Sequence, residues 1–192
     1  TSVTIPKSVT TIERHTFSYC KSLYSVGIPN SVTTIGDYAF MGWSFLPYVF
    51  IGNSVTTIGG AAFYGCSSLT YITIPNSVTT IGDEVFRDCS SLTSVTIPNS
   101  ITTIGGLAFK GCGSLTSVTI PNSVTTIGYS AFSGCTRLQK VYIGKSVKTI
   151  RTSAFNNCTS ITQISSEAVV PPACDLNVFA DIKKWNCKLF VP

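Results

Sequence analysis

The stretch LTYITIPNSVTTIGDEVFRDCSS, residues 69–91, is one unit of a repeat that runs through most of the chain. Two isoleucines and a phenylalanine of this unit recur every 23 residues, without an insertion, in seven registers. Their columns are Ile5, Ile28, Ile51, Ile74, Ile97, Ile120 and Ile143; Ile12, Ile35, Ile58, Ile81, Ile104, Ile127 and Ile150; and Phe17, Phe40, Phe63, Phe86, Phe109, Phe132 and Phe155. Self-similarity at one fixed period indicates a repeat architecture.

Local patterns within the unit predict its elements. Residues 69–74, LTYITI, are rich in β-branched side chains and are expected to form a strand. Pro75 has no N–H and ends that strand. Residues 77–82, SVTTIG, predict a second short extended segment, and the following residues up to Cys89 predict a short helical or 3₁₀ turn.

A unit of this size cannot bury its apolar residues alone, but stacked units share one continuous core. Strands of neighbouring units would then pair in parallel, about 4.8 Å apart. The repeat therefore predicts a right-handed superhelical solenoid of about seven 23-residue repeats. A parallel β-sheet would form one face, and short helical or 3₁₀ turns would form the other.

The pattern L-x-x-V/I-x-I-P, followed by S-V-T-T-I-G, A-F and G-C, resembles the BspA-type leucine-rich repeat of bacterial cell-surface proteins. The resemblance covers about residues 1–165. It implies a leucine-rich-repeat solenoid, a secreted or surface-anchored parent protein, and a role in adhesion or host binding. PPACDLNVF and CKLFVP resemble the segment that closes such arrays, so residues 166–192 are expected to form an irregular C-terminal cap.

The first residues already match the interior of the repeat, so the solenoid of residues 1–165 is expected to be N-terminally truncated. An open first coil would offer an edge for self-association. No run of about 18 apolar residues occurs, so no membrane span is expected in this fragment.

The cysteines raise questions of metal binding and cross-linking. Six occupy one register, which Trp43 fills in the second coil: Cys20, Cys66, Cys89, Cys112, Cys135 and Cys158. A metal site would need paired ligands such as C-x₂-C, which are absent, and disulfides would need facing Cβ atoms. We expect small buried thiols and no metal. Cys174 and Cys187 lie outside the repeat; in the extracellular setting that the resemblance implies, a disulfide between them and two free thiols are equally open alternatives.

Residues capable of catalysis are few. His15 is the only histidine, and Asp83 and Glu84 are adjacent in a variable turn where solvation is the default. No nucleophile, metalloprotease or phosphate-loop motif occurs. We expect no enzymatic activity and no cofactor.

The outward positions of the predicted strands vary, unlike the core. Coils starting at Leu92 and Leu115 carry only Thr and Ser there, whereas other coils carry aromatic or basic residues. Exposed rings are good contact residues, although cross-strand stacking that stabilises the sheet is the alternative. The candidate binding residues are Tyr24, Tyr48, Phe50, Tyr71, Lys140 and Tyr142.

The net charge of +5 is concentrated late in the repeat. No acid lies between Asp88 and Glu167, and this end is a candidate for an acidic protein or sulfated glycan, or else a solvated edge. Nucleic acid is not expected, because the basic cluster is small and not interleaved with aromatics. The cluster comprises Arg137, Lys140, Lys145, Lys148 and Arg151.

These observations favour a non-catalytic binding module of a bacterial surface protein, which adheres to a host extracellular protein or glycan through its exposed sheet face. The alternative is a structural spacer that displays another domain from the cell surface. A cell-surface or secreted location is inferred from the family resemblance.

Overall fold

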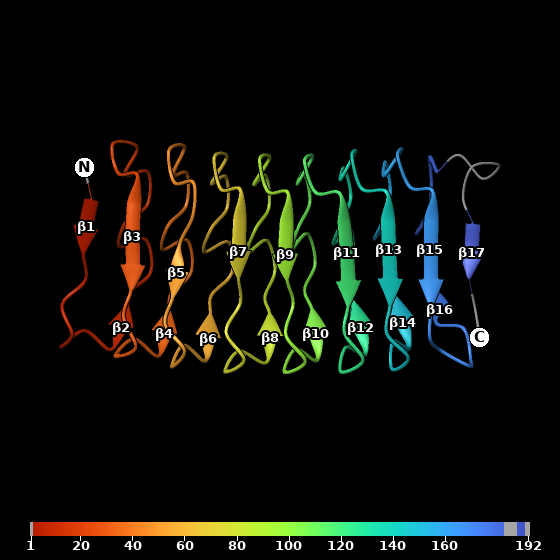
Figure 1. The fold of residues 1–192 in the computed structure, drawn as a ribbon, viewed down its shortest axis with the longest axis horizontal. Coiled ribbons are helices and arrows are strands. Elements are labelled where there is room, and N and C mark those ends of the chain that lie inside the picture. Colours follow the sequence, from red (N-terminus) through yellow and green to blue (C-terminus); the bar gives the residue numbers. More distant parts are fainter. Residues whose placement is uncertain (1, 183–187, 191–192) are drawn as a thin grey trace.

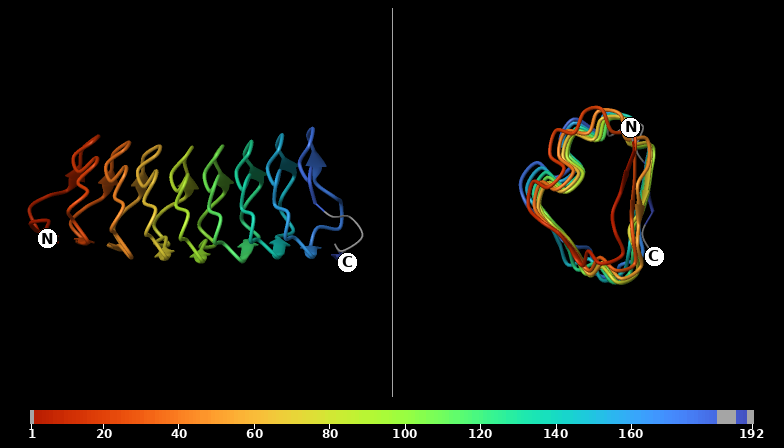
Figure 2. Two further views of the ribbon diagram at one scale, coloured as in Figure 1. Left: turned by 90° about the horizontal axis from the view of Figure 1, so that it is seen from above. Right: turned by 90° about the vertical axis from the view of Figure 1, so that its left-hand side faces the viewer.

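The coils of the chain stack in one nearly straight row (Figure 1), and seen from the end their outlines almost superimpose (Figure 2). The computed structural model describes residues 2–182 and 188–190. They form eight coils and one further strand. The coils span residues 2–22, 23–45, 46–68, 69–91, 92–114, 115–137, 138–160 and 161–182. The predicted leucine-rich-repeat solenoid is confirmed, with an eighth coil added.

Each coil contributes one strand to each of two faces, and every pairing between neighbouring coils is parallel. The first face contains β1 (Ser2–Thr4), β3 (Ser25–Ile28), β5 (Phe50–Ile51), β7 (Tyr71–Thr73), β9 (Ser94–Thr96), β11 (Ser117–Ile120), β13 (Lys140–Ile143), β15 (Gln163–Ser166) and β17 (Lys188–Phe190). The second contains β2 (Thr11–Ile12), β4 (Thr34–Ile35), β6 (Thr57–Ile58), β8 (Thr80–Ile81), β10 (Thr103–Ile104), β12 (Thr126–Ile127), β14 (Thr149–Ile150) and β16 (Ala173–Cys174). Residues pair with the equivalent residue one repeat away, as Val118 does with Val141.

The core is a set of columns, most of them dominated by one residue type. Eight phenylalanine rings, from Phe17 to Phe179, stack along the axis with centroids 5.1 to 5.7 Å apart. Leucine, isoleucine and valine columns pack around them, and no polar or charged residue is buried in the described part of the chain. Each coil thus covers the apolar surface of its neighbours, as the repeat requires.

The third side of each coil differs from the prediction of short helical or 3₁₀ turns. Within residues 2–182 it consists of hydrogen-bonded turns, and no helix is present. In the first coil the N–H groups of His15, Phe17 and Tyr19 donate to carbonyls of the second coil. The alternating Thr16 and Ser18 donate three residues back within their own coil. The backbone is therefore shared between local turns and contacts between coils.

Two residues of each coil, four positions apart, have a left-handed backbone and prevent a helix from propagating. The second of them is often glycine, as at Gly65 and Gly111, but the first never is. Tyr38 and Leu107 occupy that first position with φ of 56° and 59°. A left-handed conformation of a residue with a side chain costs about 1–2 kcal/mol, so these turns persist because contacts between coils outweigh local preference.

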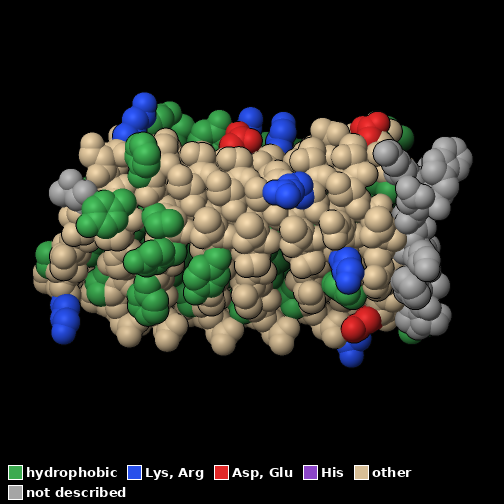
Figure 3. Space-filling view, turned by 45° about the horizontal axis from the view of Figure 1, so that its top comes forward, with side chains coloured by type: hydrophobic (Ala, Val, Ile, Leu, Met, Phe, Trp, Pro, Cys, Tyr) green, Lys and Arg blue, Asp and Glu red, His purple; other side chains and the backbone are tan. Residues whose placement is uncertain are grey.

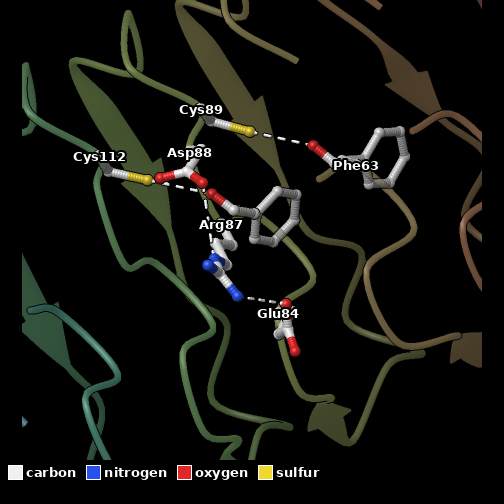
Figure 4. Close-up of polar contacts among 7 residues, drawn as sticks. Phe63, Glu84, Arg87, Asp88, Cys89 and Cys112 are labelled. Carbon is white, nitrogen blue, oxygen red and sulfur yellow. Dashed lines mark hydrogen bonds and ion pairs between the residues drawn. The ribbon is translucent and has the colours of Figure 1, made fainter. Parts of the chain in front are cut away.

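From Cys66 to Cys158 the cysteine column consists of buried free thiols, as predicted, whereas Cys20 in the first coil is half-buried. Each thiol from Cys66 to Cys158 donates to the phenylalanine carbonyl of the preceding coil, as Cys89 does to Phe63 at 3.2 Å (Figure 4). Trp43 makes the same contact with its indole N–H, which donates to the Phe17 carbonyl at 2.5 Å. Trp43 therefore replaces the hydrogen bond of the thiol as well as its volume.

Residues after β15 continue the stack rather than leaving it. Phe179 stacks on Phe155, and Val178 and Ile182 are buried in the core. This eighth coil holds one extra residue, because Asn177 follows Ser153 by 24 positions instead of 23. The extra length falls in the exposed segment around Val169 and Val170. The boundary of a C-terminal cap stays a prediction.

Candidate binding surface

Exposed aromatic side chains gather on the N-terminal part of the first face. We call this set the aromatic surface. Its side chains are 52–64% exposed, and Figure 3 shows hydrophobic groups over these coils while the middle coils carry few. The aromatic surface consists of Tyr24, Phe45, Tyr48, Phe50 and Tyr71. Its members come from three adjacent coils.

Strand alternation explains why these rings point outward. In β5, Phe50 is exposed while the next residue, Ile51, is buried. The same alternation exposes Tyr71 and Thr73 on either side of buried Ile72. Tyr48 forms a parallel bridge to Tyr71, so these two residues lie directly opposite each other on neighbouring coils.

Pro47 loosens the sheet next to these rings. In later coils the residue at this position donates its backbone N–H to the coil before, as Thr93 does to the carbonyl of Thr70. Proline has no N–H and cannot make the equivalent bond. Accordingly β5 contains only Phe50 and Ile51, and it pairs with β3 through two residues. The aromatic surface thus includes the shortest described strand of this face.

The rings of the aromatic surface do not stack on one another. Ring pairs in the described chain involve the core phenylalanines, Trp43, and the pair His15–Tyr38. None of them includes Tyr48, Phe50 or Tyr71. This arrangement gives no support to cross-strand stacking as the reason for these aromatics, and it leaves their faces available to another molecule.

A shallow hollow of about 400 Å³ lies within the aromatic surface. Tyr48, Phe50 and Tyr71 line it together with Asn53 and Pro75. A second hollow, of about 510 Å³, lies further along the same face and includes Tyr142.

The predicted site residues are therefore brought together only in part. Tyr24, Tyr48, Phe50 and Tyr71 belong to the aromatic surface, whereas Lys140 and Tyr142 lie on β13, three coils beyond β7. The side chains of both Lys140 and Tyr142 are exposed. Whether any of the six binds a ligand stays a prediction.

Phe45 was not predicted from the sequence, although at 64% it is the most exposed aromatic side chain among those that the structure describes. It precedes Leu46, the first residue of its repeat unit, so it lies outside the strand in which alternation predicts outward side chains. The signal was present: Ser22, Ser68 and Ser91 occupy this register in neighbouring coils.

The basic residues that cluster in the sequence are spread around the solenoid, from the end of the sixth coil through the seventh. Lys140 lies on the first face, and Lys148 lies just before β14 on the second. Arg137 precedes β13, while Arg151 follows β14 and approaches Asp175 at 3.9 Å. The cluster is thus a belt and not one face, which weakens the case for a single anionic partner at this end.

The adjacent acids Asp83 and Glu84 have structural partners. The Asp83 carboxylate accepts the backbone N–H of Gly106 at 2.7 Å. Glu84 pairs with Arg87 at 2.9 Å, and the same guanidinium reaches Asp88 at 3.5 Å (Figure 4). In the described residues no group of three His, Cys, Asp or Glu side chains could hold a metal ion.

Two remaining expectations concern the end of the chain and the membrane. Cys174 is exposed, but Cys187 lies outside the described residues, so their disulfide stays a prediction. The part of the chain that the structure describes contains no helix of the length and apolarity needed to cross a bilayer.

Comparison with known proteins identifies relatives of the whole array. The family model described as the BspA type leucine rich repeat region matches residues 1–112 and 79–181, in six copies. No curated protein sequence gave a significant match.

Solved structures of bacterial leucine-rich repeat proteins share the fold. One from T. pallidum has 27% identity and a TM-score of 0.68, with 94% of this chain and 75% of that chain covered. One from Bacteroides ovatus has 27% identity and a TM-score of 0.66, covering 98% and 56%. One from Eubacterium ventriosum has 34% identity and a TM-score of 0.54, covering 69% and 42%. The chain thus spans about half the length of the latter two proteins.

Proposed function

The chain belongs to the BspA-type leucine-rich repeat family, and from this premise we propose that it is a non-catalytic binding module of a bacterial surface protein. The module adheres to a host extracellular protein or glycan through its first face. The aromatic surface is the point of contact.

One observation carries this proposal: five large rings are exposed together on three adjacent coils, and they do not stack on each other. Aromatic residues dominate the energetics of interfaces because they bring a large contact area and lose little conformational freedom. A contiguous exposed apolar patch on a soluble domain commonly marks an interaction site. The core needs none of these rings, because every core column remains complete beneath them.

A double substitution tests the proposal. Tyr48→Ala with Phe50→Ala is expected to reduce adhesion to host cells, and to immobilised matrix proteins and glycans, at least tenfold, because two anchors are removed. The melting temperature should barely change, because exposed side chains contribute within about 0.5 kcal/mol. Adhesion is measured with beads coated with the purified chain, and melting by circular dichroism.

The matched control is Ser117→Ala with Thr119→Ala, which changes the same two registers three coils further on. This control should adhere like the wild type. Equal adhesion of both variants and the wild type would contradict the proposal. No adhesion by any of them would favour a spacer that only displays another domain.

A further inference from the structure

The two hollows of the first face occupy the same register of the repeat. Phe50, Ile51 and Asn53 line the hollow beside Phe50. The equivalent residues Thr119, Ile120 and Asn122 line the hollow beside Tyr142. The first hollow extends to Pro75 in the fourth coil, and the second begins at Ile97 in the fifth. The two hollows therefore follow each other along the solenoid axis in one register of the repeat, from the third coil to the eighth, and we call this line of hollows the groove.

The two walls of this groove carry different chemistry. The strand-side wall carries threonine in the middle coils and an aromatic ring near either end, at Phe50 and Tyr142. The other wall is an exposed column of asparagines, Asn30, Asn53, Asn76, Asn99 and Asn122, which Lys145 continues in the seventh coil. Phe50 and Tyr142 are four coils apart, which corresponds to roughly 19 Å at the usual strand spacing.

Asn53, Asn99 and Asn122 line the hollows, and Asn76 occupies the same register between them. The Oδ1 atoms of Asn30 and Asn122 accept the backbone N–H of the next coil at 2.8 Å, which holds the wall in register. Asn76 and Asn99 make no side-chain hydrogen bond within the described residues. Their amides are exposed and can donate to or accept from a ligand.

The groove is nearly uncharged. Among the described residues that line the two hollows, Glu167 alone is charged, and its carboxylate accepts the Asn122 amide at 3.2 Å. The basic belt offers no continuous cationic wall. Charge complementarity therefore favours a neutral occupant that is rich in hydroxyl groups.

The direction of the groove argues against a peptide. It runs across the strands, so a peptide lying in it could not add a strand, which requires a free sheet edge. An extended peptide repeats every ~3.3 Å per residue, whereas the coils repeat every ~4.8 Å, so it could not meet equivalent groups coil after coil. A sugar chain presents C–H faces that pack on aromatic rings and hydroxyl rims that hydrogen-bond to amides and threonines.

We propose that this groove binds a neutral linear polysaccharide, laid along the axis between Phe50 and Tyr142. The inference rests on the proposed function and gives its ligand a class. Phe50 belongs both to the groove and to the aromatic surface, whereas Asn76, Asn99 and Tyr142 belong to the groove alone.

Affinity electrophoresis in native gels tests this inference, with mixed-linkage β-glucan, xylan and galactomannan as neutral probes. Heparin serves as the anionic probe and gelatin as the peptide probe. At least one neutral probe should retard the chain, and the retardation should persist in 0.5 M salt. Retardation by heparin alone, by gelatin alone, or by no probe would overturn the inference.

Variants locate the binding. Asn76→Ala with Asn99→Ala should weaken binding to the neutral probe roughly fivefold or more, because two hydrogen bonds are lost. Tyr142→Ala should also weaken it, and is a second test should the asparagine variant fold poorly. The control is Thr57→Ala with Thr80→Ala on the second face, which should bind like the wild type.

The failures of the two proposals are distinguishable. If Tyr48→Ala with Phe50→Ala abolishes adhesion but the asparagine variant and Tyr142→Ala bind normally, the groove is wrong and the aromatic surface stands. If the Tyr48 and Phe50 variant adheres normally, the proposed function itself is contradicted.

Discussion

The third and sixth coils have equivalent cores and present different surfaces. Phe63 and Phe132 are both fully buried in the same column. At the two outward strand positions, the third coil carries Tyr48 and Phe50 where the sixth carries serine and threonine. The difference shows that inward residues define the fold while outward residues can change without cost to it.

The strongest test of this equivalence is the core itself. Phe63→Ala and Phe132→Ala should each lower the free energy of unfolding by about 3–5 kcal/mol, because each leaves a cavity in the phenylalanine column. Urea denaturation followed by circular dichroism measures both. A much smaller loss at Phe63 would mean that the loosened β5 region also has a softer core.

Trp43, in the second coil, is the one large residue of the cysteine column. Its substitution tests whether the surrounding core has adapted to the indole. Trp43→Cys restores the residue of the other coils, yet it should cost about 2–4 kcal/mol, because the surrounding core now fits the indole. Differential scanning calorimetry would record the change. A neutral or stabilising effect would show that the repeat pattern alone determines this position.

Alkaline pH should weaken the thiol column. Burial raises the pKa of Cys89, Cys112 and Cys135, whereas an unfolded thiol titrates near 8.5. Above that pH the unfolded chain releases protons that the folded chain retains, so stability falls by about 1.4 kcal/mol per pH unit for each thiol.

Urea titrations at pH 8, 9 and 10 measure this loss. Cys135→Ala in the sixth coil should make the loss of stability between pH 9 and 10 smaller by the contribution of one thiol. Identical slopes in the variant and the wild type would exclude the thiols as its cause.

The left-handed turn positions should behave alike in the two coils. Gly65→Ala and Gly134→Ala should each cost about 1–2 kcal/mol, since φ is 68° and 75° and the added methyl meets only ordinary contacts. Gly111→Ala should cost more, because its Cβ would lie 2.2 Å from the Asp88 carboxylate. Melting temperatures of the three variants provide the ranking, and equal values would contradict the role of that carboxylate.

The smallest effect is expected when the surfaces are exchanged. Ser117→Tyr with Thr119→Phe places the aromatic pair on the sixth coil and should change stability by no more than about 0.5 kcal/mol. Chemical denaturation provides the measurement. A larger loss would mean that the outward positions of this coil also contribute to the fold.

Most of the solenoid could be predicted because a repeat displays its own alignment. The columns of Phe63 and Ile74, and the strand end at Pro75, are all visible from spacing. The turns were mispredicted because the residues there, Leu107 among them, do not favour a left-handed backbone. Hydrogen bonds between coils impose it, and those become visible only once the coils are stacked.

The candidate surface was predictable only where strand alternation applies. That rule identifies Tyr48 and Phe50 but not Phe45, which lies before the strand. The groove could not be foreseen either, because the asparagines read as turn residues and the hollows depend on how coils align. The dispersal of Lys140 and Lys148 to different faces likewise required the path of the chain in space.

The hydrogen bonds that join the coils point along the axis, which has a mechanical consequence. A pull on the two ends of the stack would load these bonds one layer at a time rather than all at once. Each 23-residue coil that peels away would release roughly 75–80 Å of extended chain. The stack would then act as an extensible tether that lengthens in equal steps and dissipates a sudden load.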